Sequence, residues 1–410
     1  MSNQQTTAQV AILATLDTKK LEAEFLAAQI SEIGLVPIFI DVGVVGDVTT
    51  AAQYTRAAVA AAGGTSLQEL LTDPTRETAG PVMAAGATKI LGDLVKDGAI
   101  GAVIGIGGTQ GTSLCCQVMQ TLPYGFPKIM VSTVASGDTS PFVGIKDITM
   151  MFSVSDLLGL NPLTRTVLAN AAAAACGMAN HSKTLKFDKS KPVVAMTNLG
   201  VLTEGALIAQ ALLEDAGFEV IVFHAVGSGG RAMEQMMKEG MITAVFDYAL
   251  GEISDELFDG LRASGPERLT VAGKLGLPQV IVPGGAEHLG LFVSTPNEVP
   301  EKYRGHKHVF HSPVIFVPRL NGDELTQVAE SVGQRLADCT APLAMFLPEG
   351  GTSRYSIEGE TLCDKEADEV FFAALEKSLP SSCEVTRLPL HAEHPDFVGA
   401  AVKKLISMIR

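Results

Sequence analysis

The sequence predicts an α/β protein with two Rossmann-like subdomains, each built on a parallel sheet, related to each other as a structural duplication. Short apolar runs alternate with helical patterns along the chain, which is the order that gives parallel sheets covered by helices. Several of these runs are continuously apolar, as in strands that are buried on both faces. The chain has 410 residues, whereas one hydrophobic core stops growing at roughly 250–300 residues.

The first half opens with a β-α-β unit. Residues 10–14 form an apolar run, and residues 19–33 place apolar side chains at helical spacing. Gly34 ends that helix, and residues 35–41 form the next strand. A strand, a helix and a second strand in this order predict parallel pairing.

The rest of the first half continues the alternation. A helical insert is expected at about 44–98, followed by strands at residues 102–106 and 128–131. An alanine-rich helix near residues 164–178 closes this half. We therefore expect a first domain at residues 1–180.

A linker is expected at residues 181–192, a polar segment that carries several lysines and ends in proline. The same order of elements then restarts, with strands at residues 193–196 and 218–223 and a helix between them. Residues 193–410 therefore form the predicted second domain, the candidate substrate or catalytic domain.

The two halves align at the ends of their strands. Thr15 aligns with Thr197, and Gly43 aligns with Gly227. This correspondence favours a structural duplication in which the first copy carries the insert. The alternative is that any two α/β domains resemble each other at this level of detail.

Composition excludes several classes of function. The formal net charge is −15, so a nucleic-acid partner is not expected, because phosphate backbones need a basic surface. No apolar run approaches the ~20 residues of a membrane helix, and the N-terminus lacks the features of a secretory signal. The six cysteines form no Cys-x-x-Cys pair, which argues against zinc and disulfide frameworks. A cytoplasmic protein without membrane contact is the expectation.

The first candidate binding loop covers residues 105–113, between a strand and a helix. Its glycines let the backbone approach a ligand, and free N–H groups at a helix N-terminus attract anions. The loop lacks the lysine of a P-loop and the glycine spacing of the dinucleotide fingerprint. We expect phosphate or carboxylate binding here, with a plain tight turn as the alternative. The candidate nucleotide-binding residues are Gly107, Gly108, Thr109, Gly111, Thr112 and Ser113.

The second candidate loop covers residues 131–140 and contains five hydroxyl side chains, a glycine and an aspartate. Hydroxyl groups can bind phosphate oxygens, and Asp138 could hold Mg²⁺ indirectly, through a metal-bound water. The alternative is a polar turn whose side chains cap their own backbone. The candidate nucleotide-binding residues are Thr133, Ser136, Gly137 and Asp138.

A third candidate loop follows the first strand and offers Thr15, Asp17 and Thr18 as nucleotide-binding residues. The alternative is that Asp17 or Thr18 caps the following helix. Ligands of open parallel sheets bind at the carboxyl ends of the strands. All three loops follow strands of one domain, so we expect them to share one crevice.

The second half offers a glycine-rich turn at residues 227–231. We expect Gly229, Gly230 and Arg231 to bind an anionic substrate, because free N–H groups and a guanidinium both suit anions. Asp247, Glu252, Glu287 and His288 also follow strand ends. The alternative is that Arg231 pairs with a surface acid and Glu252 caps a helix.

Three histidines, His306, His308 and His311, cluster in one loop of the second half. Their spacing permits a metal site, but an extended loop presents side chains irregularly and no carboxylate lies nearby in the sequence. A solvated or catalytic loop is the favoured interpretation.

The chain resembles the family that contains the ATP-binding inhibitor domain of tomato's tobamovirus resistance protein. The resemblance rests on Thr-Leu-Asp-Thr-Lys at 15–19, Gly-Gly-Thr-Gln-Gly-Thr at 107–112 and Ser-Thr-Val-Ala-Ser-Gly-Asp at 132–138. Gly-Gly-Arg-Ala-Met-Glu at 229–234 adds to it, whereas the residues after 285 depart from the family's pattern. The resemblance implies two Rossmann-like subdomains, an ATP-type nucleotide with Mg²⁺ in the first, and dimers.

These features suggest an ATP-dependent enzyme that acts on a small anionic metabolite in the interdomain cleft. Its candidate catalytic residues are Glu252, His311 and Arg319. One alternative is a nucleotide-binding module without turnover, and another is a sugar-nucleotide or phosphosugar enzyme. The expected cofactors are ATP and Mg²⁺, and the expected assembly is a homodimer.

Overall fold

The computed structural model describes residues 9–46, 50–181, 185, 187 and 190–409. The chain divides into two compact units, residues 1–186 and 187–410. The division falls within the segment expected as a linker, of which residues 182–184, 186 and 188–189 lie outside the described residues. Each unit is described below by itself.

The N-terminal unit contains a five-stranded parallel sheet with the order β2-β1-β3-β4-β5. The first three strands in the chain are β1 (Gln9–Ala14), β2 (Val36–Asp41) and β3 (Ala102–Gly107). The last two are β4 (Lys128–Ser132) and β5 (Thr149–Phe152). The central strands β3 and β4 are buried along their whole length, as continuously apolar runs predict.

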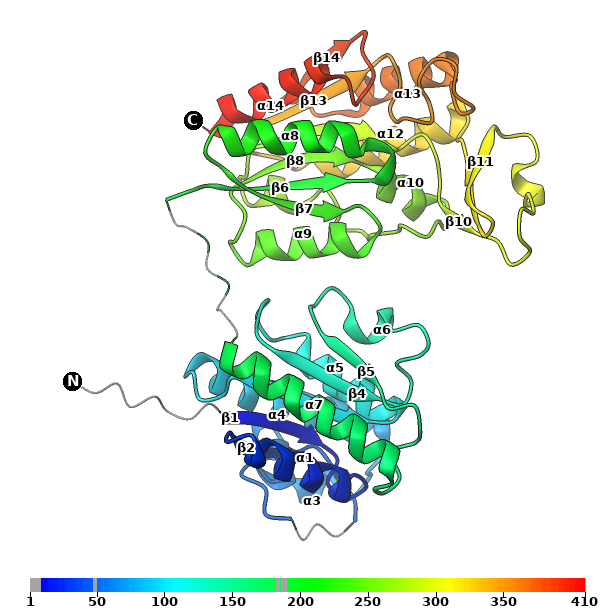
Figure 1. The fold of residues 1–410 in the computed structure, drawn as a ribbon. Coiled ribbons are helices and arrows are strands. Elements are labelled where there is room, and N and C mark those ends of the chain that lie inside the picture. The colour runs from blue at the N-terminus through cyan, green and yellow to red at the C-terminus, as the bar shows by residue number, and fades with distance from the viewer. Residues whose placement is uncertain (1–8, 47–49, 182–184, 186, 188–189, 410) are drawn as a thin grey trace. The chain divides into compact units, whose positions relative to one another are not determined.

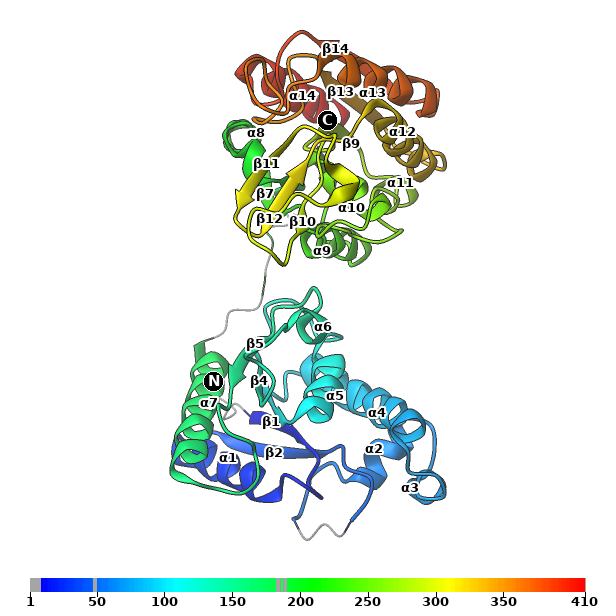
Figure 2. The same cartoon turned by 90° about the vertical axis from the view of Figure 1, so that its right-hand side faces the viewer.

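Helices cover both faces of this sheet, as Figure 2 shows. One face packs against α1 (Lys20–Glu32) and α7 (Pro162–His181). The other packs against α2 (Arg56–Ala62), α3 (Leu67–Leu70), α4 (Arg76–Lys96) and α5 (Thr109–Met119). A short helix, α6 (Ser140–Val143), follows β4. The expected insert is thus α2 to α4, and its apolar side chains complete the core on one face.

The C-terminal unit contains a six-stranded parallel sheet with the order β14-β13-β9-β8-β6-β7. Its strands are β6 (Val193–Asn198), β7 (Glu219–His224), β8 (Ala244–Ala249), β9 (Gln279–Gly284), β13 (Leu343–Pro348) and β14 (Glu384–Leu388). Counted from the first strand of each unit, both sheets follow the order 2-1-3-4-5, and the second adds a sixth strand. The expected α/β architecture with two parallel sheets is confirmed.

One face of the second sheet is covered by α8 (Thr203–Asp215) and α14 (Pro395–Ile409). The core on the other face includes α10 (Gly251–Leu257), α12 (Gly322–Leu336) and α13 (Lys365–Ser378). Shorter elements are η1 (Gly200–Leu202), α9 (Ser228–Lys238), α11 (Val271–Lys274) and η2 (Glu301–Tyr303). Figure 1 shows α8 and α9 on opposite sides of β6 and β7.

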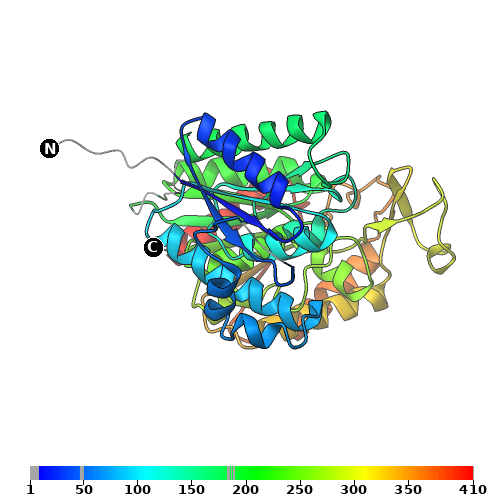
Figure 3. The ribbon, with the colours of Figure 1, turned by 90° about the horizontal axis from the view of Figure 1, so that it is seen from below.

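A small antiparallel sheet, β10-β12-β11, is inserted after β9. It consists of β10 (Leu291–Phe292), β11 (His308–Ser312) and β12 (Ile315–Pro318). Figures 1 and 3 show this yellow segment extending beyond the helices of its own unit. None of the helices in the described part of the chain combines the length and the hydropathy of a membrane span.

Candidate functional site

The N-terminal sheet has a topological switch point between β1 and β3. The chain leaves β1 toward β2 on one side, and later crosses over to β3 on the other. In sheets of this order, ligands bind in the crevice outside the carboxyl ends of the two strands that flank the switch. Thr15 follows β1 and Gly108 follows β3, so the first and third predicted loops meet at this point.

The N-terminus of α5 faces this crevice without a side-chain cap. Gly108 is the N-cap residue, and no side-chain hydrogen bond caps the helix at this position. A Cβ atom at Gly108 would find only Thr133 Oγ1, at 3.7 Å. The backbone at Gly108 is therefore approachable, and the first N–H groups of α5 have no side-chain acceptor at the cap.

Two residues of the same loop have structural roles. A Cβ atom at Gly107 would lie 2.7 Å from the Cα of Gly111, so Gly107 permits the close packing of the loop on α5. Thr112 is fully buried, and its hydroxyl lies 2.7 Å from Ser132 Oγ and donates to the carbonyl oxygen of Gly107 at 3.4 Å. Ligand contact by Gly107 and Thr112 stays a prediction, and these contacts do not favour it.

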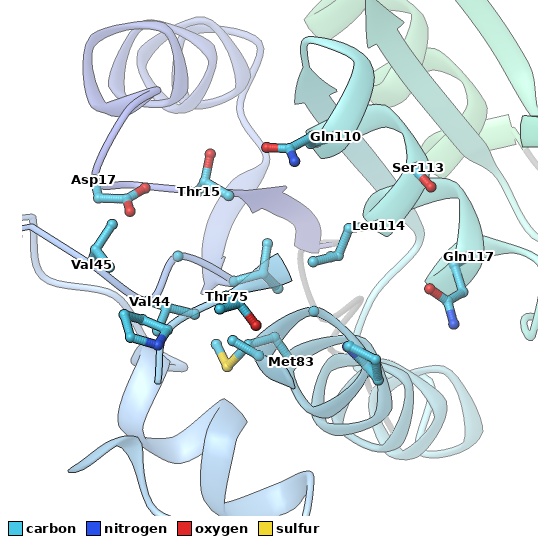
Figure 4. A pocket seen from close by; sticks show the side chains of 17 residues that line it. Thr15, Asp17, Val44, Val45, Thr75, Met83, Gln110, Ser113, Leu114 and Gln117 are labelled. Carbon is cyan, nitrogen blue, oxygen red and sulfur yellow. The ribbon is translucent and has the colours of Figure 1, made fainter. Parts of the chain in front are cut away.

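A pocket of about 460 Å³ opens beside α5 at this edge of the sheet. Figure 4 shows Thr15 and Gln110 facing each other across one end of it, while Ser113 and Gln117 project from α5. Its polar lining consists of Thr15, Asp17, Thr75, Gln110, Ser113 and Gln117. Its apolar lining includes Val42, Val44, Val45, Met83 and Leu114. The pocket thus joins one polar end to an apolar wall.

Part of this lining was not predicted from the sequence. Thr75 and Met83 belong to the start of α4, which was expected only as an insert. Val44 and Val45 follow β2. Gly43, which lies two residues after the end of β2, was a signal in the sequence that could have indicated this wall.

Two carboxylates meet at the end of β1 and β2. Asp41 Oδ1 accepts the backbone N–H groups of Leu16 at 3.1 Å and Gly43 at 2.9 Å. Burial raises the pKa of Asp41, the two N–H groups lower it, and the neighbouring Asp17 raises it again. The Oδ1 atom of Asp17 is buried and has no hydrogen-bond partner within the described part of the chain. Asp17 is therefore a carboxylate with an unused ligand position in the pocket wall.

The loop at residues 132–140 contributes differently from the expectation. Among the described residues, none of this loop is part of the pocket lining. Ser136, Gly137 and Asp138 are exposed, and Asp138 Oδ1 accepts the N–H of Ser140 at 2.9 Å. That contact is the polar turn that the sequence left open as the alternative. Thr133 is the residue of this loop that comes near the α5 N-terminus.

The loop after β1 is not a helix cap. The N-cap of α1 is Lys19, which makes no side-chain capping bond, so neither Asp17 nor Thr18 caps that helix. Thr18 is exposed, and its hydroxyl lies 2.8 Å from that of Thr15. Thr109 is also exposed, at the start of α5.

The glycine-rich turn of the C-terminal unit already holds an anion, the side chain of Glu252. Glu252 Oε1 accepts the N–H groups of Gly227 at 2.6 Å and Gly230 at 3.1 Å. Its Oε2 pairs with Arg268 Nε at 2.7 Å, and both side chains are fully buried. Glu252 is thus no free general base, and Gly230 has no N–H left for a substrate.

The neighbouring candidates are also accounted for locally. A Cβ atom at Gly229 would lie 1.9 Å from the carbonyl oxygen of His224, so Gly229 serves close packing. Arg231 is exposed and its Nε donates to the carbonyl of Gly227 at 3.4 Å. Neither residue lines the pocket beside α5 or the pocket at the carboxyl end of the C-terminal sheet. Anion binding at residues 229–231 stays a prediction, and these local contacts do not favour it.

The two remaining catalytic candidates, Arg319 and His311, have different environments. Arg319 is buried, where it donates to the carbonyl of Leu362 at 2.7 Å and pairs with Asp368 at 2.6 Å. It therefore stabilises the fold. His311 is exposed, with its Nδ1 3.3 Å from Tyr355 Oη.

The three clustered histidines do not converge. His306 pairs with Glu324 at 3.0 Å, and His308 contacts the carbonyl of His306. No group of three or more His, Cys, Asp or Glu side chains that could hold a metal ion occurs within residues 9–46, 50–181, 185, 187 and 190–409. The histidine loop is therefore a set of separate contacts rather than a ligand set.

Comparison with known proteins agrees with the division into two units. The family model described as "Uncharacterised protein family (UPF0261) N-terminal domain" matches residues 8–184, and the one described as the C-terminal domain of that family matches residues 191–409. A UPF0261 protein of Clostridium tetani is 37% identical over 401 residues, which are 98% of each chain. One of Mesorhizobium japonicum is 38% identical over 392 residues, which are 95% of this chain and 96% of that one.

A plant protein also matches. The ToMV resistance protein Tm-1(GCR237) of Solanum lycopersicum is 31% identical over 315 residues, which are 75% of this chain and 42% of the tomato protein. The resemblance drawn from the sequence motifs is confirmed by this match. The chain belongs to the uncharacterised protein family UPF0261.

Proposed function

We propose that the N-terminal unit binds ATP as its Mg²⁺ complex in the pocket beside α5. The observation that carries the proposal is the position of that pocket: it lies at the switch point of the sheet, where an uncapped helix N-terminus meets strand-end hydroxyl groups. α5 is 11 residues long, so its dipole is well developed at Gly108. Phosphate groups are the ligand that backbone N–H donors of this kind suit best.

The lining supports one orientation of the nucleotide. The apolar wall formed by Val44, Met83 and Leu114 suits the faces of a base. Thr15 and Gln110 lie at the polar end, next to the α5 N-terminus, and suit ribose or phosphate oxygens. The triphosphate would therefore extend toward Gly108, where only glycine leaves the backbone uncovered.

Mg²⁺ fits this site through Asp17 rather than Asp138. Mg²⁺ is usually held by one or two carboxylates together with waters and substrate phosphates. Asp17 Oδ1 is buried and has no hydrogen-bond partner in the described part of the chain, and Asp41 lies next to it. Two carboxylates therefore lie together at this wall, with Arg56 close enough to lower the pKa of Asp41. Asp138 already accepts a backbone N–H on the exposed side of its loop. When bound, the ion would supply charge neutralisation for the phosphates.

Nucleotide binding leaves two functions open. In the first, the protein is an ATP-dependent enzyme that acts on a small anionic metabolite. In the second, it is a nucleotide-binding module without turnover. Release of ADP or AMP in the presence of a metabolite panel supports the first, and its absence alongside measurable ATP binding supports the second. We also propose a homodimer, for which light scattering should give twice the chain mass of 42.9 kDa.

Titration calorimetry on the full chain tests the proposal. Gly108→Val should abolish the heat of Mg·ATP binding, because the side chain covers the backbone that the phosphates approach. Gly92→Val is the matched control, since Gly92 is exposed on α4 and a Cβ atom there meets nothing within 4 Å. Unchanged ATP affinity in Gly108→Val would remove the assignment, and so would absence of heat with the wild-type chain.

A further inference from the structure

The C-terminal unit contains a second pocket, of about 310 Å³, at the equivalent end of its own sheet. Leu199 follows β6, Val226 follows β7, and Leu289 follows β9, so the carboxyl ends of three parallel strands open into it. Ile315 and Val317 of β12 close another side. Most of the lining is thus apolar.

One guanidinium faces this pocket from a fixed position. Arg262 is 7% exposed, and Asp255 holds it through Nε and Nη2, both at 2.9 Å. Its Nη2 also donates to the carbonyl of His288 at 2.7 Å. Nη1 is left with a single long contact, 3.4 Å to His288 Nε2. Arg262 therefore lines the pocket with one nitrogen that has hydrogen-bonding capacity to spare.

His288 lines the same pocket and is nearly as buried, at 3% exposure. Its Nδ1 lies 3.1 Å from Glu287 Oε1, although the alignment falls short of a hydrogen bond. Burial raises the pKa of Glu287, but His288, Arg319 and Ser353 together hold it well below its usual range. The carboxylate of Glu287 therefore lies beside the imidazole, within ion-pair distance of Nδ1.

Tyr355 and His311 also contribute polar groups to the lining, as does the exposed His224. The hydroxyl of Tyr355 lies 3.3 Å from His311 Nδ1, and the ring of Tyr355 meets that of His288 edge-on, with centroids 5.8 Å apart. Both Tyr355 and His311 line the pocket. Tyr355, His311, His288 and Arg262 therefore lie around one largely apolar cavity, His311 from β11 and the other three from separate loops.

We propose that this pocket binds a small monocarboxylate with an apolar tail. The tail lies against Leu199, Leu289 and Ile315, and the carboxylate accepts hydrogen bonds from Arg262 Nη1 and the Tyr355 hydroxyl. The site belongs to the C-terminal unit alone, and the inference does not depend on nucleotide binding.

The arrangement of charge selects this class of ligand. Within the described lining, Arg262 is the one side chain that is always charged, and it is a cation. Asp255 and Glu287 lie outside the lining. Asp255 is paired with Arg262, whereas Glu287 Oε1 accepts from Ser353 and its buried Oε2 has no hydrogen-bond partner in the described part of the chain. An ammonium group would meet the guanidinium directly, and a neutral ligand would leave its Nη1 donor without a charged acceptor.

Titration calorimetry of the nucleotide-free full chain tests the inference with three probes of the same tail. The probes are 4-methylpentanoate, its amide 4-methylpentanamide, and the amine 3-methylbutylamine. The carboxylate should bind about tenfold more tightly than the amide, as a charge-assisted hydrogen bond predicts. The amine should show no binding.

Variants locate the site without disturbing its buried charges. A Cβ atom at Gly200, on the pocket rim, meets nothing within 4 Å, so Gly200→Phe should fold and fill the cavity, with loss of carboxylate binding. Gly305→Phe is the matched control, because Gly305 is equally open but lies outside the lining. Tyr355→Phe should weaken binding about threefold to tenfold. Gly108→Val should bind the carboxylate as the wild type does, even where it has lost ATP.

Three results would overturn the inference. The first is equal affinity for the carboxylate and the amide, or a preference for the amine. The second is absence of carboxylate binding at about 10 mM ligand, a concentration that detects even weak complexes. The third is wild-type carboxylate affinity in Gly200→Phe, which would place the binding elsewhere.

Discussion

Replacement of Arg268 by methionine should destabilise the C-terminal unit strongly. Arg268 is fully buried and is paired with Asp247 through both terminal nitrogens, at 2.5 and 2.6 Å. Its Nε pairs with Glu252 at 2.7 Å, and its Nη1 lies 3.6 Å from Glu234. This one cation therefore compensates three buried carboxylates.

The expected loss is about 3–5 kcal/mol in the free energy of unfolding, the range found when one partner of a buried ion pair is removed. Without Arg268, burial should raise the pKa of the carboxylates that remain. A carboxylate whose folded pKa exceeds its unfolded pKa stabilises the fold at low pH and loses that contribution as the pH rises through the folded pKa. Arg268→Met should therefore be more defective at about pH 8 than at about pH 5.

Hydrogen exchange of the peptide that covers β8 (Ala244–Ala249) measures this loss within the C-terminal unit alone. Arg231→Met is the matched control, because Arg231 is exposed, and it should change the opening free energy by less than about 0.5 kcal/mol. A loss below about 1 kcal/mol in Arg268→Met would refute the reasoning. Glu252 would then be released from its structural role and would return as a catalytic candidate.

Two further predictions concern single carboxylates. Asp17→Asn should weaken Mg·ATP binding about tenfold or more in calorimetry and leave thermal stability intact. The control Asp138→Asn should leave the affinity unchanged. Equal effects of the two substitutions would contradict the assignment of Asp17 to the metal. Burial raises the pKa of Glu234 to about 7, although Arg268 lowers it. Its contribution to stability should therefore be complete below the unfolded pKa and be lost as the pH rises through about 7. Hydrogen exchange should show this loss of stability in the wild type as the pH rises. The same loss in Glu234→Gln would contradict its assignment to Glu234.

The fold could be predicted because its signals are local. Apolar runs such as residues 102–106, bounded by glycines and followed by helical spacing, specify strand and helix wherever the chain places them. The polar segment near residues 181–192 marked the change from one sheet to the next in the same way. Both sheets are parallel and share the strand order 2-1-3-4-5, and both halves of the chain show the same alternation of strand and helix.

The candidate sites could be predicted only in part, because side-chain contacts are long-range. Gly108 and Thr15 were found because strand ends of one sheet must share an edge. The hydrogen bonds of Glu252 could not be predicted, since its carboxylate accepts the N–H of Gly227, which lies 25 residues earlier in the chain. Nor does the sequence indicate that Met83, inside an expected insert, forms a pocket wall.

The clustering of His306, His308 and His311 in the sequence does not bring their side chains together, for a related reason. Neighbours in an extended segment point in different directions. His306 meets Glu324 and His311 meets Tyr355, whereas His308 contacts the carbonyl of His306. Arg262 carried no local signal at all, because its role follows from Asp255 and from the turn that contains His288. Residues of this kind are visible only once the sheet brings its strand ends together.

Hydrogen exchange of the full chain with and without Mg·ATP tests the central claim most directly. The account predicts that ATP protects the peptides covering residues 15–18, 42–45 and 107–117, which line the pocket and the α5 N-terminus. Peptides covering residues 136–140 should exchange at unchanged rates. Protection confined to the C-terminal unit, or no protection at saturating nucleotide, would contradict the assignment of the N-terminal pocket to ATP.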